Sequence, residues 1–257
     1  MSVSYMVAGF AVGLLVGLTG VGGGSLMTPL LTLLFGISPT VAVGTDLAFA
    51  SVTKIAGTAA HRSKGNVHWN IVRLLCVGAL PMALLTTFAL KHFGGLGPEA
   101  AHIIRYSIAG SVFLTVIALM FRTRLQNWMA AHPNRQLQGK KLVVATVVSG
   151  AILGTLVTIS SIGAGAIGAT ILVLLYPRLT PAEIAGTDIA YAVPLTFIAA
   201  LGHWWLGSID WVLLATLLLG SVPGITLGSL VSRAIPEKIL RVLLATMLTT
   251  VAVKLVF

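Results

Sequence analysis

Two glycine-rich stretches carry the residue types in this chain that could bind a small charged ligand. The first is Gly-Val-Gly-Gly-Gly-Ser, from Gly20 to Ser25, and the second is Ser-Ser-Ile-Gly-Ala-Gly, from Ser160 to Gly165. Each precedes a short apolar segment, whose helix would begin at or just after the glycines. A helix N-terminus presents unsatisfied N–H donors and a charge of roughly +0.5, and glycine lets a ligand approach those donors closely. Two such termini that meet in a low dielectric would bind an anion.

The predicted anion-binding residues are the glycines and the hydroxyl-bearing residues of the two stretches. They are Thr19, Gly20, Gly22, Gly23, Gly24 and Ser25 in the first stretch, and Ser160, Ser161, Gly163 and Gly165 in the second. Neither stretch contains lysine or arginine. Backbone dipoles and hydroxyl groups would therefore hold the anion, which suits a ligand that must also leave the site.

Asp46 and Asp188 are the only acidic residues well inside predicted membrane-spanning segments, and each follows a threonine, Thr45 or Thr187. A carboxylate in the membrane interior is costly and marks a functional position. These residues could brace the glycine stretches by accepting N–H bonds, or an aspartate could carry a proton together with the anion. A cation site is a third reading. We favour bracing for both aspartates, and Asp46 is the first to test for proton coupling because its stretch is richer in glycine.

Lys54 is a basic residue inside a predicted span. It lies eight residues after Asp46, which corresponds to about 12 Å along a helix. At that separation a counter-charge role for Asp46 is disfavoured. We expect the lysine side chain to extend to the inner membrane surface instead.

No catalytic motif accompanies these residues. The sequence contains no nucleophile elbow, no His-Glu-x-x-His pair and no phosphate-binding P-loop. His61 and His203 lack a carboxylate or cysteine at ligand spacing, so we expect them to pack near helix ends and not to bind a metal. Cys76 is the only cysteine, which excludes an intramolecular disulfide and a paired thiol redox motif. The sequence therefore predicts no enzyme, no cofactor and no metal site.

The elements that must position these residues are membrane helices. Of the 257 residues, 57% are hydrophobic and 9% are charged, and the mean hydropathy is +1.01. This composition predicts an all-α polytopic membrane protein. The net charge of +10 does not indicate nucleic-acid binding, because the basic residues are scattered between apolar segments, where they report topology.

Each half of the chain contains five apolar segments, and the second segment is short in both halves. The segments cover 3–18, 25–36, 40–60, 70–91 and 100–121, and then 142–159, 166–176, 182–202, 211–231 and 239–256. A helix of about 12 residues extends about 18 Å and cannot cross a hydrocarbon core of about 30 Å. The short segments either form re-entrant hairpins with the preceding helices, which leaves six full spans, or they cross within a ten-span protein.

The two halves are copies of one another at an offset of 142 residues, the separation of Pro39 from Pro181. The matched pairs include Gly44-Thr45-Asp46 with Gly186-Thr187-Asp188, His61 with His203, Gly65 with Gly207, Trp69 with Trp211, Gly78 with Gly220 and Pro81 with Pro223. We divide the chain into a first repeat at 1–121, a basic cytoplasmic linker at 122–141 and a second repeat at 142–257. Interrupted segments at matching positions of two repeats indicate a transporter binding site.

The basic residues predict the orientation. With 61–69 in the cytoplasm, twelve lysines and arginines lie on that side and three lie outside, a strong positive-inside bias. The loop at 203–211 and both termini are then external. An odd number of elements per repeat therefore inverts the second copy relative to the first.

At these motifs the chain resembles the TauE/SafE family of sulfite exporters, also called the 4-toluene sulfonate uptake permease family. The resemblance rests on the stretch from Gly20 to Pro29, on Gly44-Thr45-Asp46, and on their echoes in the second half. It implies a multi-pass permease of the bacterial inner membrane for small sulfur-containing anions such as sulfite or organosulfonates. In the second copy Ser161 and Ala166 replace Gly20 and Ser25, so the two termini could bind unequally.

Two other classes compete with the permease. An anion channel would use the same residues, and a membrane-embedded thiol carrier or assembly factor would need a cysteine pair. The partners expected are a small anion and the lipid bilayer, without nucleic acid. Protons as the coupling ion and a homodimer stay open, as do the anion and the direction of transport.

Overall fold

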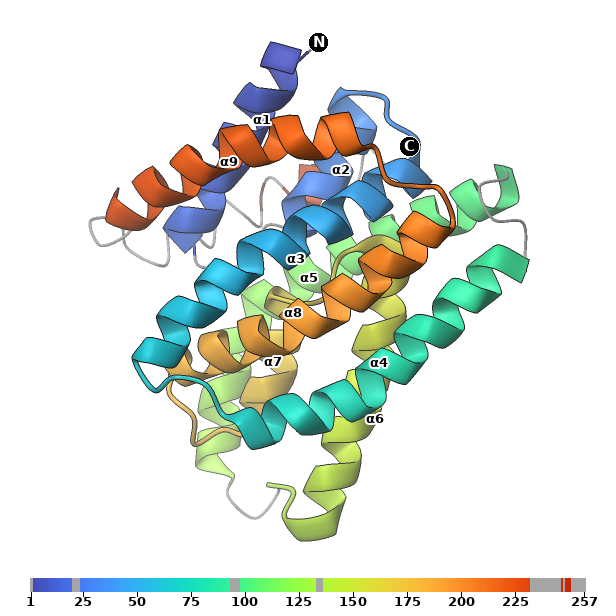
Figure 1. The fold of residues 1–257 in the computed structure, drawn as a ribbon. Coiled ribbons are helices and arrows are strands. Elements are labelled where there is room, and N and C mark those ends of the chain that lie inside the picture. Colours follow the sequence, from blue (N-terminus) through green and yellow to red (C-terminus); the bar gives the residue numbers. More distant parts are fainter. Residues whose placement is uncertain are drawn as a thin grey trace.

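The computed structural model describes residues 2–19, 24–92, 98–132, 136–231, 246 and 248–250. Every regular element in this part of the chain is an α-helix (Figure 1), which confirms the all-α class. The helices are α1 (Ser2–Thr19), α2 (Gly24–Leu34), α3 (Pro39–Ser63), α4 (Trp69–His92), α5 (Pro98–Ala131), α6 (Gly139–Ser160), α7 (Ala166–Leu175), α8 (Pro181–Trp205) and α9 (Trp211–Val231).

Helix boundaries agree with the predicted segments at most positions. The short second element of each half is present, as α2 with 11 residues and α7 with 10. The helix predicted at 239–256 falls almost wholly outside the described residues. The fifth element was expected to end at 121, but α5 continues to Ala131, because the polar residues after 121 include no glycine or proline that would end a helix.

Proline marks the start of α3 and α8, as the sequence predicted. Ser38 is the N-cap of α3, with Pro39 in the first turn. At α8, Thr180 forms a full capping box: its hydroxyl accepts the Glu183 N–H, and the Glu183 carboxylate accepts the Thr180 N–H. The two helices therefore begin at matching positions of the two halves.

Five of the described helices are long and apolar enough to cross a membrane. They run over Trp69–His92, Ala101–Met129, Gly139–Ser160, Pro181–Trp205 and Trp211–Gly228. The chain is a multi-pass membrane protein on this evidence. Whether α2 and α7 re-enter or cross stays a prediction.

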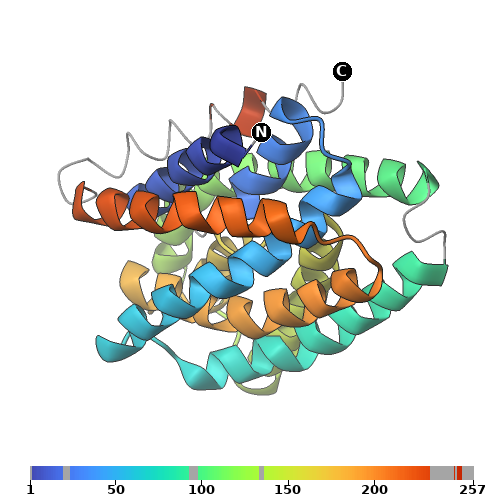
Figure 2. The same cartoon turned by 45° about the horizontal axis from the view of Figure 1, so that its top comes forward.

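The two halves pack against each other through corresponding pairs of helices. The long helix α9 of the second half packs against α1 of the first, and α4 of the first packs against α6 of the second (Figures 1 and 2). Gly220 lies against the Met6 carbonyl, and its counterpart Gly78 lies against the Val147 carbonyl. Neither position has room for a Cβ atom. Small residues permit this close backbone approach between membrane helices.

The N-terminal parts of α3 and α8 also form reciprocal contacts between the two halves. The Thr45 hydroxyl accepts the Asp210 N–H at 3.1 Å, and the Thr187 hydroxyl accepts the His68 N–H at 3.1 Å. Asp210 and His68 are themselves 142 residues apart. When a residue of one half contacts a residue of the other half, a two-fold axis requires the same contact between the copies of these two residues. They support the internal duplication, while the orientation of each half in the membrane stays a prediction.

Candidate functional site

The second glycine stretch forms a tight, buried loop between α6 and α7. Ser161 ends α6 in a left-handed conformation, with φ 59° and its N–H donating to the Val157 carbonyl at 2.8 Å. Gly163 and Gly165 have φ of 137° and 135°, a region that favours glycine. Ala166, which begins α7, is 4% exposed. The interrupted backbone therefore lies inside the protein, where membrane proteins tolerate it.

The two serines of this loop have different surroundings. The Ser160 hydroxyl donates to the Leu156 carbonyl at 2.7 Å and lies 3.1 Å from the Ser111 hydroxyl, so it stabilises the end of α6. The Ser161 hydroxyl is buried and finds no hydrogen-bond partner among the described residues. Ser161 is thus the better placed of the two to meet a ligand.

The first glycine stretch falls largely outside the described residues. This applies to Gly20, Gly22 and Gly23, and to the side chains of Thr19 and Ser25. Helix α1 ends at Thr19 and helix α2 begins at Gly24, so the described helices lie on either side of the predicted interruption.

The Asp46 side chain of α3 accepts hydrogen bonds from α2. Its Oδ2 atom accepts the Thr28 N–H at 3.2 Å and the Thr28 hydroxyl at 2.6 Å. Its Oδ1 atom is buried without a partner among the described residues. The contact reaches the start of α2 just after the glycines, and Thr45 next to it contacts the other half of the protein instead.

Asp188 of α8 approaches α7. Its Oδ1 atom lies against Gly168 in the first turns of α7, and a Cβ atom at Gly168 would overlap with it. The same added Cβ would be 3.4 Å from the Tyr191 hydroxyl. Both Asp188 Oδ1 and the Tyr191 hydroxyl lack a partner among the described residues. Tyr191 was absent from the predicted site, although its spacing of three from Asp188 places both on one helix face.

The prediction for Lys54 is wrong. The residue is only 5% exposed, and its Nζ donates to the Ala164 carbonyl in the second glycine loop at 3.2 Å. The charges of both Asp46 and Asp188 act on it. The prediction considered Asp46 on the same helix alone, whereas α3 packs against α8, which supplies the second carboxylate. A lysine therefore reaches the second glycine loop, which the prediction of a site formed by backbone dipoles and hydroxyls did not include.

These groups form one buried polar cluster, consisting of Asp46, Lys54, Ser161, Asp188 and Tyr191. Four of its oxygen atoms have no partner among the described residues: one carboxylate oxygen of each aspartate and the two hydroxyls. The Ser161 hydroxyl lies near the Asp46 carboxylate without reaching hydrogen-bonding geometry. Burying unpaired polar atoms is costly. The cluster is therefore suited to a small polar or charged ligand.

The matched histidines contact different groups. His203 is fully buried, with Nε2 at 2.9 Å from the Thr158 carbonyl and Nδ1 at 2.9 Å from the Ser208 hydroxyl. It joins the end of α8 to α6 in the interior. His61 is half-buried and its Nδ1 has no partner in the described part of the chain. No group of three potential metal ligands occurs among the described residues.

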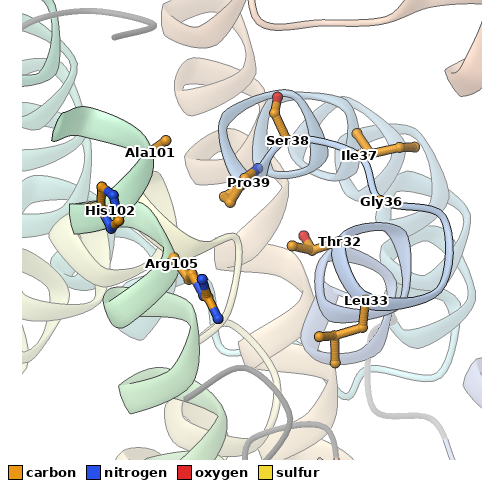
Figure 3. A pocket seen from close by; sticks show the side chains of 9 residues that line it. All are labelled: Thr32, Leu33, Gly36, Ile37, Ser38, Pro39, Ala101, His102 and Arg105. Carbon is orange, nitrogen blue, oxygen red and sulfur yellow. The ribbon is translucent and has the colours of Figure 1, made fainter. Parts of the chain in front are cut away.

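A pocket of about 450 Å³ lies between α5 and the turn that joins α2 to α3 (Figure 3). Thr32 and Ser38 line one side, and His102 and Arg105 of α5 line the other. The Thr32 hydroxyl donates to the Thr28 carbonyl at 2.9 Å. The pocket is thus one helical turn from the Thr28–Asp46 contact, and two basic side chains line it.

Comparison with known proteins gives one consistent result. Residues 5–255 match the family model described as Sulfite exporter TauE/SafE. The chain is 36% identical over its full length to the full-length probable membrane transporter protein YjnA of Bacillus subtilis. It is 28% identical to YdhB of the same organism, with 90% of this chain and 91% of that protein aligned. A probable membrane transporter protein of Xylella fastidiosa is 25% identical over 88% of this chain and 82% of its own. No solved structure matches.

Proposed function

This chain belongs to the sulfite exporter TauE/SafE family, and we propose that its substrates are small sulfur-containing anions such as sulfite or organosulfonates. It is a membrane transporter and not an enzyme. The family description supports the substrate class. The relatives are named only as probable membrane transporters, so the choice of anion depends on the chemistry of the site.

The observation that carries this proposal is the position of Lys54. Its ammonium group donates to the Ala164 carbonyl in the loop just before the N-terminus of α7. A fixed positive charge beside an interrupted helix is a combination that binds anions. The hydroxyls of Ser161 and Tyr191 add two buried donors without partners in the described residues. Sulfite and sulfonate groups present several acceptor oxygens that could use all of these donors.

The proposal places this site between the two repeats, with the glycine stretch of the first repeat facing that of the second. The reciprocal contacts at Thr45 and Thr187 support a two-fold relation between the halves. We take the axis to lie in the membrane plane, with both termini outside the inner membrane, on the basis of the charge asymmetry.

Flux into liposomes tests the proposal. Purified protein is reconstituted, and uptake of sulfite, sulfate, taurine, sulfoacetate and thiosulfate is compared with protein-free liposomes. Saturable uptake of at least one of these anions is expected. Uptake against a concentration gradient when a proton gradient is imposed distinguishes a transporter from a channel. Absence of protein-dependent flux for the whole panel would refute the substrate class.

A further inference from the structure

The charge content of the buried cluster is unbalanced. Lys54 contributes one positive charge, and Asp46 and Asp188 contribute two carboxylates, each at most 5% exposed. The other titratable or charged groups near them are Tyr191 of α8, Cys76 of α4, which acts on Tyr191, and Arg122 of α5, which acts on Asp188 and is half-exposed. A net charge in a membrane interior is costly. With both carboxylates charged, Arg122 of α5 offsets the second negative charge, so a further anion in the cluster requires a proton.

The two carboxylates have different hydrogen bonds. Asp46 accepts two donated bonds from Thr28, a geometry that only an acceptor oxygen can satisfy. Asp188 accepts no hydrogen bond from the described residues, and its Oδ1 atom is buried and unpartnered. A protonated carboxyl group can donate as well as accept. Asp188 can therefore change protonation state without breaking a contact that holds a helix.

The first repeat alone supplies the lysine. Position 196, which matches Lys54, is a threonine whose hydroxyl donates to the Ala192 carbonyl of its own helix at 2.8 Å. The hydroxyl of Tyr191 likewise has no equivalent, because the matching residue is Phe49. The duplication has thus produced one lysine for two aspartates. This asymmetry offers natural replacement residues for testing each side chain.

We propose that Lys54 supplies the positive charge of the anion site and that Asp188 takes up one proton for each anion that replaces it beside Lys54. This inference rests on the proposed anion transport and adds its coupling. In the empty protein Lys54 interacts with the carboxylates. When a monovalent anion binds to the Lys54 ammonium, a proton from water adds to an Asp188 oxygen, and the cluster gains no net charge. The pair crosses together, and the proton and the anion leave on the other side.

The valence of the anion determines whether its flux depends on the membrane potential. A monovalent sulfonate and one proton carry no net charge, so their flux should not depend on the membrane potential. Thiosulfate carries two negative charges, and the cluster provides a single further carboxylate. Its flux with one proton should therefore move one net negative charge and respond to the potential. The sequence-based expectation that Asp46 is the first candidate for coupling is replaced here by Asp188.

The test compares variants in liposomes that contain a pH-sensitive dye and hold a potential set by potassium and valinomycin. The probes are methanesulfonate as the monovalent anion and thiosulfate as the divalent anion. The wild type should acidify the lumen by one proton per methanesulfonate at every potential. Asp188→Asn should still bind and carry the anion, but without acidification and with a flux that now depends on the potential. Asp46→Asn should lose thermal stability yet keep the proton-to-anion ratio.

Lys54 is tested by anion binding to detergent-purified protein. Lys54→Thr, which copies position 196, should bind the sulfur-labelled probe roughly tenfold to a hundredfold more weakly, the value of a charge-assisted contact. Lys54→Arg keeps the charge and should retain most of the affinity. Lys54→Thr could fail to fold because two buried carboxylates lose their positive partner. The double variant Lys54→Thr with Asp188→Asn removes one of these two negative charges. It should fold and show the same loss of binding.

The outcomes separate this inference from the proposed function. Wild-type affinity in Lys54→Thr or in the folded double variant would overturn the lysine assignment. Wild-type anion transport without lumen acidification, or full acidification in Asp188→Asn, would overturn the coupling. In each of these cases anion transport itself would stand. No flux of any anion in the wild type would refute the proposed function and this inference with it.

Discussion

Gly168 offers the sharpest test of how α7 and α8 form the site. A Cβ atom at Gly168 would overlap with the Asp188 Oδ1 atom, and the next nearest side-chain groups are Asp188 Cγ at 3.3 Å and the Tyr191 hydroxyl at 3.4 Å. All three atoms belong to side chains, so Gly168→Ala can be accommodated when Asp188 rotates about its χ angles. The variant should therefore displace the carboxylate while α7 stays in place.

The expected size of the effect follows from two opposing contributions. Alanine in a helix is favoured over glycine by roughly 1 kcal/mol, and overpacking a full site costs roughly 1–3 kcal/mol. The net loss in the free energy of unfolding should thus be about 0–2 kcal/mol. The effect on proton coupling should be larger: a displaced Asp188 carboxylate can no longer exchange with the anion beside Lys54, so the proton-to-anion ratio should fall below one.

Two glycines serve as controls for this experiment. Gly110 of α5 has open space around it, so Gly110→Ala should leave transport unchanged and stability unchanged or slightly higher. Gly220 of α9 lies against backbone atoms of α1, which cannot rotate away. Gly220→Ala should therefore lower the melting temperature more than Gly168→Ala does. Thermal unfolding in detergent and lumen acidification per transported anion measure the two quantities. A wild-type proton-to-anion ratio in Gly168→Ala would refute the role given to Asp188.

Three further predictions follow from the described geometry. Gly65 and Gly207 are exposed, matched turn residues with φ of +70° and +74° and no other atoms within 4 Å of an added Cβ. In a Cys76→Ala background, Gly65→Cys and Gly207→Cys should react with an impermeant thiol reagent from opposite sides of the membrane. Labelling of both from the same side would exclude the inverted repeat. Thr45→Val and Thr187→Val should each remove the partner of a part-buried N–H and lower the free energy of unfolding by about 0.5–1.5 kcal/mol. Very unequal losses on denaturation would argue against the two-fold relation. Gly165→Val should strain the loop at φ 135°, at a cost of about 1–3 kcal/mol, and abolish anion binding in protein that can still be extracted; retained binding would show that this loop only packs.

The sequence by itself determined the class of protein and the interruption between α6 and α7. Both depend on local properties: apolar segments partition into a membrane, and glycine disfavours a helix. The internal repeat also follows from the sequence. Gly24 and Ala166, Pro39 and Pro181, and Trp69 and Trp211 begin corresponding helices at the predicted offset. These features need no knowledge of which helices are neighbours.

Only the tertiary structure decided which side chains meet at the site. Lys54 contacts a carbonyl 110 residues away, and Thr187 contacts an N–H 119 residues away. Spacing along α3 indicated that Lys54 was too far from Asp46 and gave no information about Asp188 on α8. The orientations of Ser160 and Ser161, adjacent in sequence, likewise depend on how α6 ends. Contacts between helices depend on where the helix axes cross and which helix faces turn inward. Local patterns in the sequence do not specify either of these.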